Sequence, residues 1–236
     1  MKIFQKGFNY SQDGPGNRLV YHLQGCNMNC PWCSNPEGIS LDGKCENITP
    51  EAMAAEILSA KPMFFDGGGV TFTGGEATLQ ADEIKEVLGR IKGIHTVIET
   101  NGNNASLSEL LPLIDLVIFD LKHYDDSAYK QIGGCGKLIK ENLKMLFESG
   151  RQCIIRTPLI NGFNASKGDA GGFLAIIGRT ALSVPLFEFL PYHEYGRDKW
   201  KKIGLQYQIN DAFVSNEQVD LFKKLYGING LKVINT

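Results

Sequence analysis

The chain has 236 residues, of which 43% are hydrophobic and 21% charged, and its formal net charge is −2. These values are typical of a globular protein with one ordinary core, and the lack of a basic run argues against a nucleic-acid partner. No apolar stretch in the sequence is long enough for a membrane span, and no basic leader followed by apolar residues is present. We therefore expect a single domain over residues 1–236, in the cytoplasm and with no membrane partner.

Strand-like and helix-like segments alternate along the chain, which favours an α/β fold with parallel strands. Helices are predicted at residues 49–59, 81–92, 106–111, 137–149 and 171–182. Strands are predicted at residues 18–24, 69–73, 95–99, 116–120, 152–157 and 186–190. Six such βα units suit an incomplete barrel, a partial (β/α)6 barrel related to the eight-stranded form.

Polar and charged residues follow these strands one after another. A protein core has no use for such side chains, so we expect them to converge on one ligand at the carboxyl ends of the strands. In chain order they are the cysteines after the first strand, then Gly74, Gly75 and Glu76, then Glu99 and Thr100, then Asp120 and Lys122, then Arg156, and finally His193.

Three cysteines stand close together in the run GCNMNCPWC, at Cys26, Cys30 and Cys33. Iron–sulfur clusters normally take four thiolates. A 4Fe-4S cluster held by three would leave one iron open, and the amino acid end of S-adenosylmethionine could chelate that iron. The triplet therefore predicts a radical enzyme.

Other interpretations of the cysteines exist. Zinc would accept this loop if Cys45 or His22 completed a tetrahedral site, which would make the chain a zinc-binding module. A disulfide framework is disfavoured, because six unevenly spaced cysteines in a chain of this length indicate a reducing compartment. Cys153 lies in the apolar run CIIRTPLI and is expected to be a buried structural thiol. Cys45 and Cys135 receive no role.

The C-x3-C-x2-C spacing, with Trp32 before the last cysteine, resembles the signature of the radical S-adenosylmethionine superfamily. Six further stretches, spread from residue 13 to residue 200, resemble the glycyl radical enzyme activating enzymes. They are DGPGNR (13–18), GGGVTFTGGE (67–76), ETNG (99–102), FDLK (119–122), IRTPLINGFN (155–164) and LPYHEYGRDKW (190–200).

This resemblance implies a fold of the radical S-adenosylmethionine type and an activating reaction. Reductive cleavage of S-adenosylmethionine would give a 5'-deoxyadenosyl radical, which abstracts hydrogen from a glycine of a separate glycyl radical enzyme. An electron donor such as flavodoxin would supply the electron. Only Cys45 appears between residues 34 and 66, so we expect no ferredoxin-like insert and one 4Fe-4S cluster. A radical enzyme acting on a small molecule or peptide is the alternative.

The resemblance also assigns roles to individual residues. Three cysteines hold the cluster, a second group binds S-adenosylmethionine, a third holds a monovalent cation, and a fourth contacts the glycine-bearing peptide. The cofactor group is Trp32, Cys33, Ser34, Gly74, Gly75, Glu76, Asp120, Leu121, Lys122, Arg156 and His193; the cation group is Glu99, Thr100 and Asp120; the peptide group is Asp13 and Gly14. Glu99 stands where the family pattern has aspartate. Arg156 could instead pair with Asp120 or Glu99.

Overall fold

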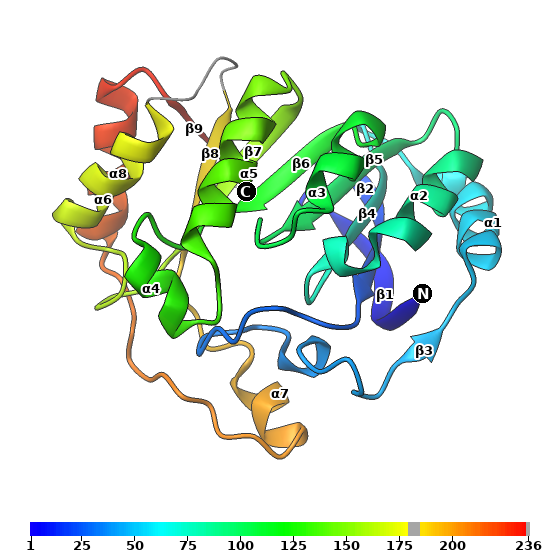
Figure 1. The fold of residues 1–236 in the computed structure, drawn as a ribbon, viewed down its shortest axis with the longest axis horizontal. Helices are drawn as coiled ribbons and strands as arrows, with labels where there is room; N and C mark the ends of the chain where they lie inside the picture. Colours follow the sequence, from blue (N-terminus) through cyan, green and yellow to red (C-terminus); the bar gives the residue numbers. More distant parts are fainter. Residues whose placement is uncertain (179–184, 235–236) are drawn as a thin grey trace.

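The computed structural model describes residues 1–178 and 185–234, and in these residues the strands form one nine-stranded sheet (Figure 1). The strands are β1 (Lys2–Tyr10), β2 (Asn17–Leu23), β3 (Glu46–Asn47), β4 (Gly69–Gly74), β5 (His95–Thr100), β6 (Leu116–Asp120), β7 (Gln152–Leu159), β8 (Leu186–Pro191) and β9 (Lys232–Ile234). The helices are α1 (Pro50–Ala60), α2 (Ala81–Arg90), α3 (Leu107–Leu110), α4 (Asp126–Gln131), α5 (Gly136–Glu148), α6 (Lys167–Ile177), α7 (Arg197–Lys202) and α8 (Asn216–Ile228).

The sheet is parallel from β2 to β9 and open at its ends. Its order is β3-β1-β2-β4-β5-β6-β7-β8-β9, so the end strands β3 and β9 each have a single neighbour in the sheet. Among the strands of the described residues, antiparallel pairing occurs only between β1 and β2 and between β1 and β3. The expected partial barrel is therefore confirmed, with an antiparallel hairpin added at one edge.

The register of the parallel strands brings their polar ends together. Asp120 at the end of β6 lies opposite Arg156 on β7, and Arg156 lies opposite Glu188 on β8. Glu99 on β5 lies opposite Ile118 on β6. Because parallel strands end at the same edge of a sheet, four charged residues from four strands become neighbours.

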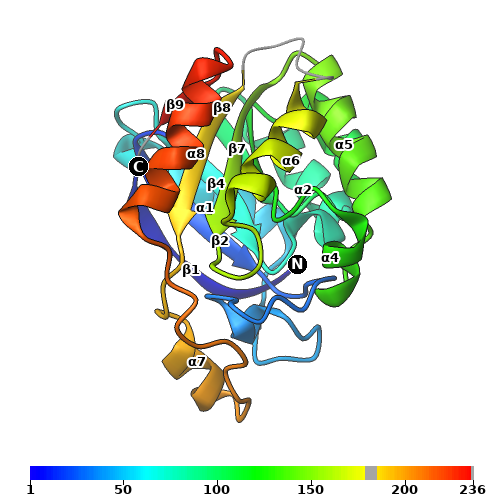
Figure 2. The same ribbon diagram turned by 90° about the vertical axis from the view of Figure 1, so that its left-hand side faces the viewer.

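Helices pack against the outer face of the sheet through apolar stripes (Figure 2). On α5, for example, Ile139, Leu143 and Leu146 are buried at spacings of four and three residues, which places them on one helix face. The segment after β2 lies close to α7, in the lower part of the molecule in both views (Figure 1 and Figure 2). Trp200 of α7 donates its indole N–H to the Cys33 carbonyl oxygen at 2.8 Å.

The predicted strands and helices match the structure closely, apart from the start of one helix and several elements that were not predicted. The predicted helix at 171–182 begins earlier, at Lys167, because Ser166 and Asp169 form a capping box; its predicted end, residues 179–182, lies outside the described residues. The strands β1, β3 and β9 and the helices α4, α7 and α8 were not predicted. In residues 1–178 and 185–234, no helix has both the length and the hydrophobicity needed to cross a bilayer.

Candidate active site

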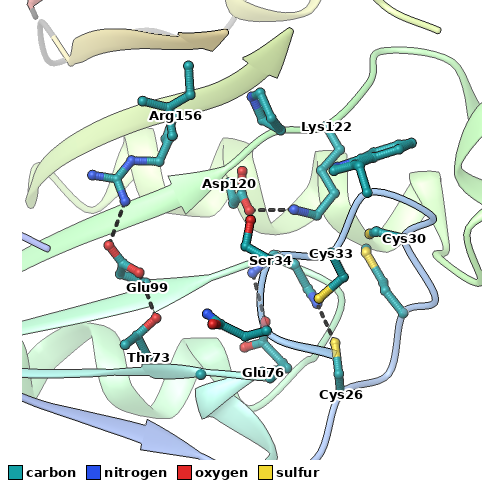
Figure 3. Close-up of a pocket in the computed structure, with 18 of the residues that line it drawn as sticks. Cys26, Cys30, Cys33, Ser34, Thr73, Glu76, Glu99, Asp120, Lys122 and Arg156 are labelled. Carbon is teal, nitrogen blue, oxygen red and sulfur yellow. Dashed lines mark hydrogen bonds and ion pairs between the residues drawn. The ribbon is translucent and has the colours of Figure 1, made fainter. Parts of the chain in front are cut away.

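A cavity of about 350 Å³ opens at the carboxyl ends of the parallel strands, and the three cysteines lie on one side of it (Figure 3). Of the residues predicted from the sequence, those that line it are Asp13, Cys26, Cys30, Trp32, Cys33, Ser34, Gly74, Gly75, Glu76, Glu99, Thr100, Asp120, Lys122, Arg156 and His193. The segments that carry them are far apart in the chain. The convergence expected from the strand ends is therefore present.

Backbone hydrogen bonds hold the cysteine loop in place. Gly25 N–H donates to the Gly38 carbonyl at 2.8 Å, and Cys26 N–H donates to the Ile39 carbonyl at 3.0 Å. Cys33 N–H donates to the Cys30 carbonyl at 3.1 Å, which closes a tight turn. The loop is thus fixed by its own continuation, and its three thiols face one space.

Burial dominates the chemistry of the three thiols. It raises the pKa of Cys26 and of Cys30 to about 12 and that of Cys33 to about 11. Such thiols release their protons only when a bound cation compensates the buried negative charge of the thiolates. Soft thiolates are the preferred ligands of iron–sulfur clusters, so this donor set on one cavity wall fits a cluster of that kind.

Two adjacent glycines bring the backbone next to the cysteine loop. Gly74 has a φ of +123°, and a side chain there would meet the Leu23 backbone nitrogen at 2.2 Å. A side chain on Gly75 would meet the Gly25 carbonyl oxygen at 2.1 Å. Any larger residue would force the end of β4 away from the cysteine loop, so both positions require glycine.

Glu76 ties this glycine turn to the next strand. Its carboxylate is 1% exposed and accepts hydrogen bonds from the Thr78 N–H at 3.1 Å, the Thr100 hydroxyl at 2.7 Å and the Asn101 N–H at 2.7 Å. Burial raises the pKa of Glu76, while these hydrogen bonds oppose the rise. Glu76 therefore supports the turn, as its place in the sequence indicated, and it also positions the residues after β5.

Lys122 forms an ion pair with Asp120 at the end of β6, in which the Asp120 carboxylate stays partly exposed. The lysine is 8% exposed. Burial alone would lower its pKa, but the Asp120 carboxylate and the nearby cysteine thiols outweigh burial and raise it. Lys122 therefore carries a positive charge into the cavity beside the cysteines, where it can attract an anionic ligand group.

Arg156 on β7 joins two carboxylates, Glu188 from the adjacent strand β8 and Glu99 from β5, which lies beyond β6 in the sheet. Its Nη1 lies 2.7 Å from Glu99 Oε1, and its Nε lies 2.6 Å from Glu188 Oε2. Thr73 donates its hydroxyl to the other Glu99 oxygen at 2.6 Å. Burial raises the pKa of Glu99 to about 7, with Arg156 opposing that rise. The pairing of Arg156 with Glu99 was foreseen as one possibility, whereas Glu188 was not predicted.

The loop between β1 and β2 reaches the cavity through Asp13. Arg156 donates to the Gln12 carbonyl at 2.8 Å, and the Thr71 hydroxyl donates to the Asp13 carbonyl at 2.7 Å. The fully buried Arg18 holds the loop from below, with Nη1 donating to the Pro15 carbonyl at 2.9 Å. The loop backbone is thus anchored, and the Asp13 side chain lies at the cavity wall.

Aromatic groups form part of the rim. Trp32 is 8% exposed and packs on Phe163 with ring centroids 4.8 Å apart, so it belongs to the core as well as to the cavity. His193 is half-buried and stacks on Tyr195 at 4.2 Å. Burial lowers the pKa of His193, which keeps its ring neutral near pH 7 and suits stacking better than proton transfer.

Two predicted residues do not line the cavity. Leu121 is fully buried, and its N–H donates to the Arg156 carbonyl at 2.9 Å. Gly14 lies instead at a second, mostly apolar cavity of about 560 Å³. The sequence interpretation missed Thr73 and Asn101, which both line the main cavity. Asn101 stands inside the motif ETNG, and that motif was the available signal.

Among residues 1–178 and 185–234, no three His, Cys, Asp or Glu side chains are arranged around a single metal-ion position. Cys153 is 5% exposed, as expected for a structural thiol. In the described residues the six cysteines are all free thiols.

Comparison with known proteins places the chain in a family. Residues 20–170 match the family model of the radical SAM superfamily. The pyruvate formate-lyase-activating enzyme of Clostridium pasteurianum is 38% identical over 84% of this chain and 85% of its own length. The enzyme of the same name from Staphylococcus aureus is 31% identical over 87% of this chain and 86% of its own length.

A solved structure agrees with these matches. It is a domain of the pyruvate-formate lyase-activating enzyme from Bacteroides vulgatus, with a TM-score of 0.59 and 25% identity over 72% of this chain and 99% of that domain. The match to the superfamily model and to activating enzymes implies a 4Fe-4S cluster with S-adenosylmethionine, not a zinc-binding module. The chain belongs to the radical SAM superfamily, and its relatives there include pyruvate formate-lyase-activating enzymes.

Proposed function

We propose that this protein activates a glycyl radical enzyme, with pyruvate formate-lyase as the partner that its relatives' names suggest. The observation that carries the proposal is the placement of Cys26, Cys30 and Cys33 on one wall of a cavity that Asp13 and Lys122 also line. When bound, a 4Fe-4S cluster supplies the electron that cleaves S-adenosylmethionine to the 5'-deoxyadenosyl radical, which takes hydrogen from a partner glycine.

The chain's own residues would bind and orient the reactants. Cys26, Cys30 and Cys33 would hold three irons and leave the fourth open. The buried Lys122 ammonium would bind the methionyl carboxylate, while backbone groups at Gly74 and Gly75 would bind the methionyl ammonium.

The remaining cofactor contacts would come from the rim and the charged wall. Trp32, Ser34 and His193 would contact the adenine, and Arg156 would keep the Glu99 side chain in place.

The partner's glycine would enter beside the loop between β1 and β2. Asp13 lies at the cavity wall with its backbone anchored by Thr71, which suits a contact to an incoming peptide. Flavodoxin remains the expected electron donor and nucleic acid is not expected to bind.

Glu99, Thr100 and Asp120 would hold a monovalent cation. Turnover measured in sodium, potassium and choline salts tests that site, and equal rates in all three would contradict it.

The decisive experiment is electron paramagnetic resonance on the complete system. Anaerobic, reconstituted protein with S-adenosylmethionine, reduced flavodoxin and pyruvate formate-lyase should give a glycine-centred doublet. The same mixture with the Cys30→Ala variant is the control and should give none. Formation of 5'-deoxyadenosine without a doublet on any glycyl radical enzyme would favour a small-molecule or peptide substrate instead.

A further inference from the structure

The sulfur of Cys26 receives a hydrogen bond from a side-chain amide. Asn101 Nδ2 lies 3.8 Å from Cys26 Sγ, a separation suited to an N–H donor and the large sulfur atom. A dashed line ends at the Cys26 sulfur in Figure 3. The contact connects the turn after β5 with the cysteine loop, so it is set by the tertiary structure.

The orientation of the Asn101 amide is determined by its other partners. Asn101 Oδ1 accepts from the Asn103 N–H at 2.9 Å, so the amide nitrogen must point the other way, toward the cysteine loop. There Nδ2 also donates to Asn27 Oδ1 at 3.0 Å. With two N–H groups, the amide can serve both Asn27 and Cys26.

The Asn101 backbone is fixed as well. Its N–H donates to Glu76 Oε2 at 2.7 Å, and Glu76 is itself buried. Asn101 is 6% exposed, so little water competes for its amide. The donor is therefore held in place before any cluster binds, and it needs no rearrangement to reach the sulfur.

A donor to a ligand sulfur changes the energy of electron transfer. Reduction adds one negative charge to a cluster and its thiolates, and an N–H group directed at a thiolate stabilises the more negative state. We propose that Asn101 is a positioning residue that raises the reduction potential of the cluster through its hydrogen bond to Cys26. This inference rests on the proposed function, because it requires the iron–sulfur cluster.

Reduction potentials of three variants test the proposal. Asn101→Leu removes the amide at similar size, and Asn101→Asp keeps the acceptor for Asn103 but has no N–H for Cys26. Asn104→Leu is the matched control, because Asn104 stands in the same turn but donates to the Thr78 carbonyl at 2.9 Å. The readout is the amount of reduced cluster seen by electron paramagnetic resonance at set solution potentials.

At a fixed solution potential, we expect the ratio of reduced to oxidised cluster to fall about tenfold in Asn101→Leu, which is about 59 mV for a one-electron couple. Asn101→Asp should fall further, because its carboxylate adds negative charge beside the sulfur. Asn104→Leu should match the unaltered protein.

Iron and sulfide are measured first in every sample. An unaltered protein without them contradicts the proposed function itself. A loaded protein whose Asn101 variants keep the original potential overturns the inference, and so does an equal fall in Asn104→Leu, which would indicate general loosening of the turn. If both Asn101 variants fold but fail to bind iron, Asn101 acts in cluster assembly and the proposal is wrong; if one loads, its potential decides.

Discussion

The two sides of the cavity are held by different interactions. On the side of the cysteines, one buried carboxylate, Glu76, is surrounded by neutral donors from Thr78, Thr100 and Asn101. On the other side, Arg156 forms charged pairs with Glu99 and Glu188. In the view of Figure 3, Asp120 lies between the Arg156 side and Cys30.

The difference shows how one site can combine rigidity with adjustable charge. Neutral donors around a carboxylate fix geometry, and their effect does not depend on the protonation of other side chains. The strength of the Arg156 pair with Glu99 depends on whether Glu99 carries a proton, because burial raises the pKa of Glu99 to about 7. The geometry of the cysteine side therefore depends on one carboxylate held by neutral donors, and the Arg156 side depends on charges that one guanidinium shares.

The largest effect is expected from removing a cysteine ligand. Loss of a residue that merely supports a metal ligand costs about 10- to 100-fold in affinity or activity, so Cys30→Ala should lower iron binding and glycyl radical formation by more than about 100-fold. Iron and sulfide assays and radical yield measure this. Cys153→Ala is the control, because Cys153 is buried away from the main cavity, and it should keep its iron. Equal loss in both would argue against a cluster on the cysteine loop.

Breaking the charged side should cost the most stability. Arg156→Met removes the guanidinium that both Glu99 and Glu188 contact, and disrupting a buried ion pair costs about 3–5 kcal/mol. Denaturant unfolding of the two proteins gives the difference directly. Arg151→Met, on an arginine just before β7 that donates to the Pro112 carbonyl, should cost less than about 1 kcal/mol. Similar costs for the two variants would mean that the Arg156 pairs contribute little.

Altering the Glu76 carboxylate on the cysteine side should cost less stability than altering Arg156. Glu76→Gln keeps the size but places an NH2 group against either the Thr78 N–H or the Asn101 N–H, which leaves a buried donor without an acceptor. We expect a loss of about 1–3 kcal/mol in the free energy of unfolding. Glu86→Gln on the exposed face of α2 provides the reference. An unchanged stability in Glu76→Gln would show that the turn does not depend on this carboxylate.

The pH dependence of stability should report the titration of Glu99 on the Arg156 side. Burial raises the pKa of Glu99 from 4.5 to about 7, so between these values the folded protein binds more protons than the unfolded chain. The contribution of Glu99 is thus most favourable below pH 4.5 and is lost as the pH rises through 7, with a slope of at most about 1.4 kcal/mol per pH unit.

Glu99→Gln removes this titration. Unfolding free energies measured from pH 5 to pH 8 should therefore fall less steeply with rising pH in the variant than in the unaltered protein. Parallel curves would contradict the raised pKa, and a steeper fall in the variant would reverse its sign.

Much of this site was predictable because its residues carry chemistry that a core does not need. Cys26, Lys122 and His193 each follow a predicted strand, and parallel strands end at a common edge, so their convergence followed from the pattern alone. The predicted strand limits were close to the observed ones because apolar runs bounded by turn residues are local signals. The capping box that begins α6 at Lys167 was also local but was overlooked.

The partners of these residues were decided by the tertiary structure. Glu188 stands in a predicted strand, and only the register of β7 with β8 places it opposite Arg156. Asn101 is a neutral residue in a turn, with nothing in its neighbours to indicate that its amide faces Cys26. The sequence by itself determined where the predicted strands lie along the chain, where the cysteine triplet stands and which family motifs are present, because residue type and local periodicity carry them. Which side chains touch was decided by strand register and packing between distant segments, which no local pattern encodes.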